Sequence, residues 1–251
     1  MDNLQALHSS VGRLRAMVEP LSVVTLGSSA YPSEWTIAQV LSHIGSGAVI
    51  MRRRLDDAME GVETPAEFAP AVWDDWNAKD PRAQADDSLA ADRVLLVRLD
   101  GLSTDERGRL QFGMGPMTFD YDQVVGLRLN EHALHTWDIE VALDVAAVLP
   151  AEIAALVVDN LELIARYTGK PAGAPATITV HTTEPSKDFT VMVTTDGATL
   201  ESGRSGTAAE LELPAEAFCR LVYGRLDRDH SPPGLADHPT VEHLRHVFPG
   251  P

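Results

Sequence analysis

Cysteine is almost absent from this sequence, since Cys219 is the one cysteine among 251 residues. A single cysteine excludes a disulfide within the chain and every metal or redox motif that needs two cysteines. Thiol chemistry would therefore require either Cys219 or a thiol supplied by another molecule. Because Cys219 lies in the amphipathic segment Phe218-Cys219-Arg220, we expect a core thiol rather than a nucleophile.

Basic residues and long apolar runs are also scarce. The chain has 20 lysine and arginine residues against 37 acidic ones, a formal net charge of -17. Because affinity for nucleic acids and anionic membranes comes largely from basic groups, we expect neither as a partner. No apolar run approaches the roughly 20 residues that span a bilayer. The first residues lack the basic and then apolar pattern of a signal peptide, so we expect a cytoplasmic protein. The sequence leaves its oligomeric state open between a monomer and a homodimer.

The first part of the chain has the hydrophobic spacing of helices. Apolar residues recur at intervals of three and four, which predicts helices over 2–18, 34–59, 86–100 and 119–143. Ser33 is the predicted N-cap of the second helix. The prolines that follow this helix predict a loop carrying Trp73 and Trp76, placed either against the bundle or at the mouth of a pocket.

The pattern changes near Pro150. One helix is predicted over 151–167, followed by alternating, strand-like segments over 176–181, 189–193 and 209–213, with a turn at Asp196-Gly197. Pro214 opens a further predicted helix that runs through Tyr223. We therefore expect an α+β protein with a helical domain over 1–149 and a smaller α+β domain over 150–251.

The most informative segment lies in the fourth predicted helix. At about 100° per residue, Glu131, His135 and Asp138 fall on one face whose other residues are mostly apolar. Ionisable groups on such a face are costly to bury unless they are hydrogen-bonded, paired or bound to a metal. The i, i+4 spacing of Glu131 and His135 suits one metal ion held by one helix.

His43 interrupts an apolar face of the second predicted helix in a similar way. Gly45 and Gly47 follow it, and each costs about 1 kcal/mol relative to alanine inside a helix. A partner helix or a ligand is therefore expected to approach closely there. With Glu131 and His135, His43 supplies two imidazoles and one carboxylate, the set that catalytic zinc uses while one position stays open.

Asp138 would then orient a histidine ring as a hydrogen-bond acceptor. Two simpler interpretations remain open, a core or surface histidine at position 43 and a helical ion pair between Glu131 and His135. Arg128 is expected at the surface or beside Glu131, and His132 is expected to be structural or exposed. The C-terminal histidines are expected in a solvated segment rather than a metal site: His238, His243 and His246.

Two segments resemble a known family. Trp35-Thr36-x-x-x-Val40-x-x-His43-Ile44 and Arg128-x-x-Glu131-x-x-x-His135-x-x-Asp138 resemble motifs of the DinB-like superfamily of metal-binding four-helix bundles, and more narrowly of the mycothiol-dependent maleylpyruvate isomerase family. Leu221-Val222-Tyr223-Gly224-Arg225 resembles the late Leu-x-x-Gly-Arg motif of that family. The sequence departs from the pattern at Gln39, where relatives usually have an acidic residue, and at Ile44, where leucine is common.

The resemblance implies a DinB-like four-helix bundle that holds zinc, or another divalent metal, through His43, Glu131 and His135. It implies a second domain resembling sterol-carrier folds, mycothiol as the thiol cofactor, an electrophilic small molecule as the substrate and an actinobacterial host. Arg225 stands where the isomerases have an arginine important for activity. A guanidinium there could bind a carboxylate of the substrate or cofactor through two hydrogen bonds.

The expected chemistry follows from the metal. A divalent ion with these ligands lowers the pKa of a bound thiol or water. A thiolate that adds to a conjugated double bond, allows rotation about the resulting single bond and leaves again catalyses cis–trans isomerisation. If the adduct is kept, the reaction is S-transfer. A hydrolase or amidase that activates water and a non-catalytic metal-binding protein are the alternatives, and the second domain with Arg225 favours the thiol-dependent enzyme.

Overall fold

The computed structural model describes residues 1–31, 34–203 and 209–250. The chain divides into two compact units, Met1–Asp144 and Val145–Pro251, which are described separately below. The sequence-based boundary between residues 149 and 150 falls within the second of these units. None of the helices in the described part of the chain has both the length and the apolar character needed to cross a membrane.

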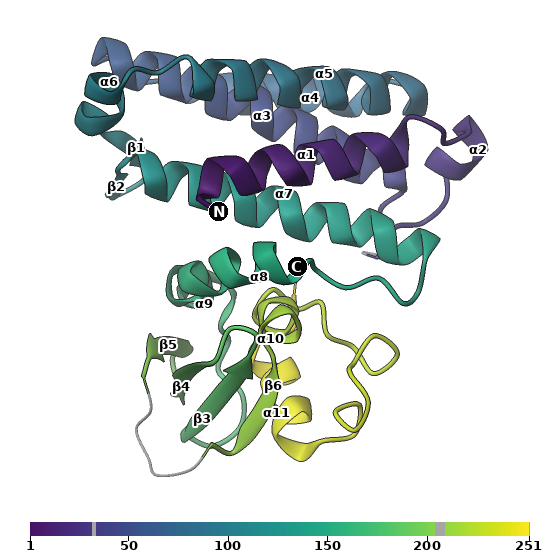
Figure 1. Cartoon of the computed structure of the whole chain (residues 1–251), viewed down its shortest axis with the longest axis vertical. Coiled ribbons are helices and arrows are strands. Elements are labelled where there is room, and N and C mark those ends of the chain that lie inside the picture. Colours follow the sequence, from purple (N-terminus) through teal and green to yellow (C-terminus); the bar gives the residue numbers. More distant parts are fainter. Residues whose placement is uncertain (32–33, 204–208, 251) are drawn as a thin grey trace. The chain divides into compact units, whose positions relative to one another are not determined.

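The first unit is built around four long helices (Figure 1): α1 (Asn3–Val18), α3 (Ile37–Glu60), α5 (Pro81–Asp100) and α7 (Tyr121–Leu143). Helix α3 packs along α5 and α1 along α7, while α1 also contacts α5 and α3 contacts α7. These four pairings close a bundle, as predicted. Shorter elements connect them: α2 (Val23–Leu26), α4 (Phe68–Asn77), α6 (Thr104–Arg109) and the hairpin of β1 (Phe112–Met114) and β2 (Met117–Phe119).

The beginning of α3 is set by a capping box. The Thr36 hydroxyl accepts a hydrogen bond from the backbone N–H of Gln39, and the Gln39 amide oxygen accepts one from Thr36 N at 2.8 Å. Thr36 is therefore the N-cap of α3, and Ser33, which was predicted to fill this role, lies outside the described residues. The departure at Gln39 leaves the capping box complete, because an amide oxygen accepts here as a carboxylate would.

Helix α4 replaces the predicted tryptophan loop. Pro70 occupies the first turn of this helix, where a missing N–H costs nothing, so the prolines of this region do not exclude a helix. Trp76 is buried against α3, and a Cβ added at Gly45 would lie 2.2 Å from its indole ring. The close approach predicted for this glycine is therefore made by a neighbouring tryptophan. Trp73 of the same helix is exposed.

The second unit combines helices with a mixed four-stranded sheet in the order β5-β4-β3-β6. The strands are β3 (Ala176–Thr183), β4 (Lys187–Val193), β5 (Ala198–Ser202) and β6 (Leu211–Pro214), of which only β3 and β6 pair in parallel. Phe189 of β4 packs on Phe218 of helix α10 (Ala215–Val222), with ring centroids 5.2 Å apart. The α+β class is confirmed.

Several local predictions for this unit need correction. The single helix predicted over 151–167 is two helices, α8 (Ala151–Val157) and α9 (Leu161–Thr168), separated by the 3-10 turn Val158–Asn160. Strand β5 was not predicted, although the Asp196-Gly197 turn that leads into it was. The C-terminal segment was expected to be solvated, but it forms α11 (Pro239–Val247). One face of this helix is buried, because it carries the apolar residues Val241, Leu244 and Val247.

Candidate metal centre

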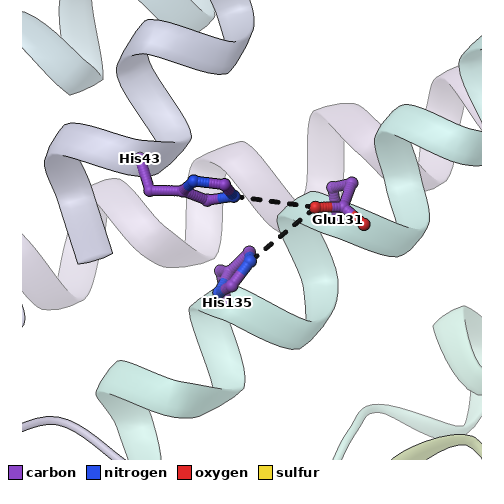
Figure 2. Close-up of side chains that lie close together, drawn as sticks. All are labelled: His43, Glu131 and His135. Atoms are coloured by element: carbon purple, nitrogen blue, oxygen red, sulfur yellow. Dashed lines mark ion pairs between the residues drawn. The ribbon is translucent and has the colours of Figure 1, made fainter. Parts of the chain in front are cut away.

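His43, Glu131 and His135 converge where α3 passes α7 (Figure 2). Glu131 Oε2 lies 3.7 Å from Nε2 of His43 and 3.7 Å from Nε2 of His135. One potential ligand atom from each residue lies within 4.8 Å of the other two. Among the described residues, this is the one group of three or more His, Cys, Asp or Glu side chains that meets this criterion.

The arrangement fits a divalent ion. Zinc–ligand distances of about 2.1 Å in a tetrahedron place the ligand atoms about 3.4 Å apart. The observed 3.7 Å separations are close to this value and exceed the usual length of an N–H···O hydrogen bond, about 2.7–3.2 Å. Because the side chains of His43 and Glu131 are 40% and 48% exposed, both can make the small adjustment that coordination requires and an ion can reach them.

Asp138 fixes the orientation of His135. It is fully buried, and its Oδ2 lies 2.8 Å from Nδ1 of His135. With the carboxylate as acceptor, Nδ1 is the donor in this contact, and the lone pair of the ring is then left on Nε2, the nitrogen that faces Glu131. The contact between Asp138 and a histidine ring is the one expected from the sequence.

Trp35, the first residue of the His43 motif, lies beside the His43 ring. Its indole centroid is 5.6 Å from the His43 ring, and the side chain remains 38% exposed. The backbone around it is held in place, because Trp35 O accepts a hydrogen bond from Ala30 N at 2.9 Å and Thr36 forms a β-bridge with Ser29. Trp35 therefore gives the site an ordered aromatic surface.

Arg128 is not where the sequence analysis placed it. It is buried, and its Nη2 donates to Asp92 Oδ1 at 2.7 Å and to the carbonyl of Ile44 at 2.9 Å. His132 is also buried, as the structural alternative predicted, with Nε2 3.2 Å from Asp92 Oδ2. Burial alone would raise the pKa of Asp92, but His132 and Arg128 outweigh it and hold that pKa below its ordinary value.

Asp92 was not singled out in the sequence, because α5 contains several aspartates and composition alone does not distinguish a buried one from an exposed one. One signal does distinguish it, since it falls in the helical register of the apolar stripe that α5 buries: Ala85, Leu89, Leu96 and Leu99. An aspartate in such a stripe needs a charged or hydrogen-bonding partner.

Arg225 belongs to the second unit, whereas the three converging residues belong to the first. It is buried, and its Nη1 donates to the carbonyl of Tyr223 at 3.0 Å. Gly224 before it has φ of +68°, and a Cβ there would lie 2.1 Å from Gly250 Cα, which explains the glycine of the motif. The role of Arg225 in activity stays a prediction.

Cys219 is confirmed as a core thiol. It is completely buried in α10, and this burial raises the pKa of its thiol far above the ordinary value. A group held in the neutral thiol form and shielded from solvent is inert as a nucleophile. The chain therefore offers no thiolate of its own at neutral pH.

Comparison with known proteins gives the family. The model of the mycothiol maleylpyruvate isomerase N-terminal domain matches residues 7–140. The chain belongs to this family. The predictions of the family and of an enzyme are thereby confirmed, and the match includes all three converging residues of the site.

Two solved structures share the fold. They are crystal structures of the mycothiol-dependent maleylpyruvate isomerase and of a histidine-to-alanine mutant of it, each with a TM-score of 0.64 and 16% identity over 89% of this chain and 88% of the other. At this identity the likeness shows a common fold across nearly the whole chain. No curated protein sequence matches the chain significantly.

Proposed function

We propose that this protein is a mycothiol-dependent isomerase whose divalent metal, zinc in the first instance, is held by His43, Glu131 and His135. The observation that carries the proposal is the convergence of these three donors, with Asp138 bound to the far nitrogen of His135. Membership of the maleylpyruvate isomerase family and the shared fold of the solved isomerases support the reaction type. A small molecule with a cis double bond conjugated to a carbonyl is the matching substrate class.

The metal, when bound, lowers the pKa of a thiol or a water beside it. The residues of the chain prepare the site for this role. Asp138 keeps the proton of His135 on Nδ1, so that Nε2 faces the centre as a lone-pair donor. Trp35 provides an apolar surface beside His43 against which a conjugated substrate can pack.

The thiol has to come from another molecule, because Cys219 is buried and protonated. The thiolate sulfur of this external thiol adds to the double-bond carbon farther from the carbonyl, and the π electron pair moves onto the carbonyl oxygen as an enolate. The former double bond is then a single bond and rotates. Loss of the same thiol restores the double bond in the trans geometry. No atom is gained or lost by the substrate, so the thiol acts as a catalyst.

Metal binding by single-residue variants tests the site. We expect the purified wild-type protein to bind zinc stoichiometrically, and His43→Ala and Glu131→Gln to bind it at least about tenfold more weakly, because each removes a ligand. His8→Ala is the matched control, since His8 is an exposed histidine paired with Asp100. Equal zinc affinity in wild type and both ligand variants, measured by competition with a chelating dye, would contradict the proposed centre.

Turnover separates the thiol-dependent reaction from hydrolysis. We expect the zinc-loaded protein to isomerise maleylpyruvate in the presence of mycothiol and not in its absence. Hydrolytic turnover of electrophilic substrates without added thiol would instead support the water-activating alternative. A zinc-loaded, folded protein that isomerises no such substrate with mycothiol would refute the isomerase assignment.

A further inference from the structure

A second group of polar side chains is buried in the bundle close to the candidate metal centre. It comprises Ser10, Asp92, Arg128 and His132, none of them more than 5% exposed, and is called the Asp92 network below. None of the four is a proposed ligand. The network therefore needs an explanation of its own.

The Asp92 network connects all four long helices. Asp92, on α5, accepts one hydrogen bond from Arg128 at Oδ1, and its Oδ2 lies 3.2 Å from His132 Nε2. Both partners are on α7. The second ring nitrogen of His132 lies 2.7 Å from the hydroxyl of Ser10, on α1. Arg128 also donates to the carbonyl of Ile44, on α3, at 2.9 Å.

Bundle stability does not account for such a network. A buried ion pair loses so much hydration that well-packed apolar residues of similar volume are often as stabilising or more so. What a buried ion pair does supply is one defined arrangement, because its hydrogen bonds are satisfied in a single register. Helix α3 has a glycine where the Arg128 side chain approaches it. A Cβ at Gly47 would lie 3.1 Å from Arg128 Nη1.

The Asp92 network makes hydrogen bonds on α3 and α7 next to His43, Glu131 and His135. On α3 it holds the carbonyl of Ile44, the residue that follows His43. On α7 Arg128 and His132 lie on either side of Glu131 in the sequence and within one helical turn of it. Arg128 thus joins α7 to α3 at the residue next to His43, three residues before Glu131.

We propose that Arg128, anchored by Asp92, is a positioning residue that sets the distance between His43 and the Glu131–His135 pair. Among the described residues no hydrogen bond or ion pair joins Arg128 or Asp92 to the converging side chains, so in this proposal both act through the backbone of α3 and α7. The proposal rests on the metal-binding function proposed above. Metal affinity and coordination geometry should depend on the network even where the stability of the fold does not.

The double variant Asp92→Leu/Arg128→Met tests this inference, because it removes both charges together and leaves neither one unpaired. The probe is Co²⁺ titrated into the full-length protein, followed by its visible absorption, together with zinc competition and chemical unfolding. We expect the double variant to stay folded, at reduced stability because Nε2 of the buried His132 loses its Asp92 partner. Metal binding should be about 10- to 100-fold weaker, with an altered Co²⁺ spectrum. Arg13→Met is the control, since it breaks an ion pair between α1 and Glu140 of α7 that does not involve α3.

Gly47→Ala keeps every polar residue of the Asp92 network and provides the second variant. Alanine favours the helix, so the fold is retained, but its Cβ displaces the Arg128 guanidinium. Among the described residues, and leaving out α3 itself, this guanidinium is the group within 4 Å of that position. We expect weaker metal binding here too. Wild-type affinity and spectrum in both the double variant and Gly47→Ala would overturn the positioning role, whereas failure of the wild type to bind metal would instead count against the centre itself.

Discussion

At the scale of single residues, the two histidines of the candidate centre are held differently. The His135 side chain is only 13% exposed and its Nδ1 is engaged by Asp138, whereas the His43 side chain is 40% exposed and lies against the indole of Trp35. His135 is thus preset in one tautomer and one direction. His43 has more freedom, so its position depends more on the helix that carries it.

Asp138→Asn isolates this orienting contact. The amide has nearly the same shape but no charge, so it holds the Nδ1 proton of His135 less strongly and reduces the basicity of Nε2. We expect zinc affinity to fall by about 10- to 100-fold with all three proposed ligands still present. Isothermal titration with zinc measures this effect, and circular dichroism checks that the helices are retained. Unchanged affinity would mean that Asp138 has only a packing role.

At the scale of elements, the site depends on how α3 is fixed along its length. The Asp92 network holds it against α5 and α7, and Trp76 of α4 packs against Gly45. Gly45 lies two residues from His43, so α4 supports the segment that carries this histidine. A glycine at this point lets the tryptophan ring approach the backbone.

Gly45→Ala should therefore destabilise the protein, even though alanine is the better helix former. Its Cβ would lie 2.2 Å from the Trp76 ring and 2.8 Å from the backbone of Ser88, and overpacking of this kind costs about 1–3 kcal/mol. Gly12→Ala is the matched control, because no described residue outside the α1 backbone lies within 4 Å of a Cβ at that position. There we expect a gain of about 0.5–1 kcal/mol. Urea unfolding of both variants measures these changes. Equal effects on the free energy of unfolding would show that the Trp76 ring moves aside without destabilising the protein.

At the scale of the whole molecule, the chain distributes its proposed functional residues over two units. The metal ligands lie in the first unit and Arg225 in the second. The family match covers residues 7–140, so it includes the ligands but does not extend to Arg225. The contribution of the second unit is accordingly open to direct measurement.

Arg225→Ala separates metal binding from turnover. If Arg225 binds a carboxylate of the substrate or of mycothiol, its loss removes a charge-assisted interaction worth about 1.5–3 kcal/mol, so kcat/KM should fall at least about tenfold. Zinc affinity should be unchanged, because no ligand is altered. Thermal unfolding must accompany the assay, since Arg225 is buried and bonded to Tyr223 O. Full activity in the variant would leave Arg225 with a structural role only.

Sequence by itself determined what depends on neighbours along the chain. The positions of α1, α7 and α10 follow from hydrophobic period and helix-start signals, and the pairing of Glu131 with His135 follows from one turn of a helix. The sequence pointed to His43 as their partner through its place on an apolar helix face and through the motif resemblance, while a core or surface histidine stayed open. The helix positions and the Glu131–His135 pair need only the geometry of a single element.

Tertiary structure decided the rest. A helical wheel places Arg128 on a face of α7 but cannot say that α5 presents an aspartate to that face, so a buried anchor was mistaken for a surface residue. Likewise, Pro70 alone could not distinguish a loop from the first turn of α4, a helix that packs against Gly45 through Trp76. In both cases the outcome depended on contacts between segments far apart in the chain, which leave no period in the sequence.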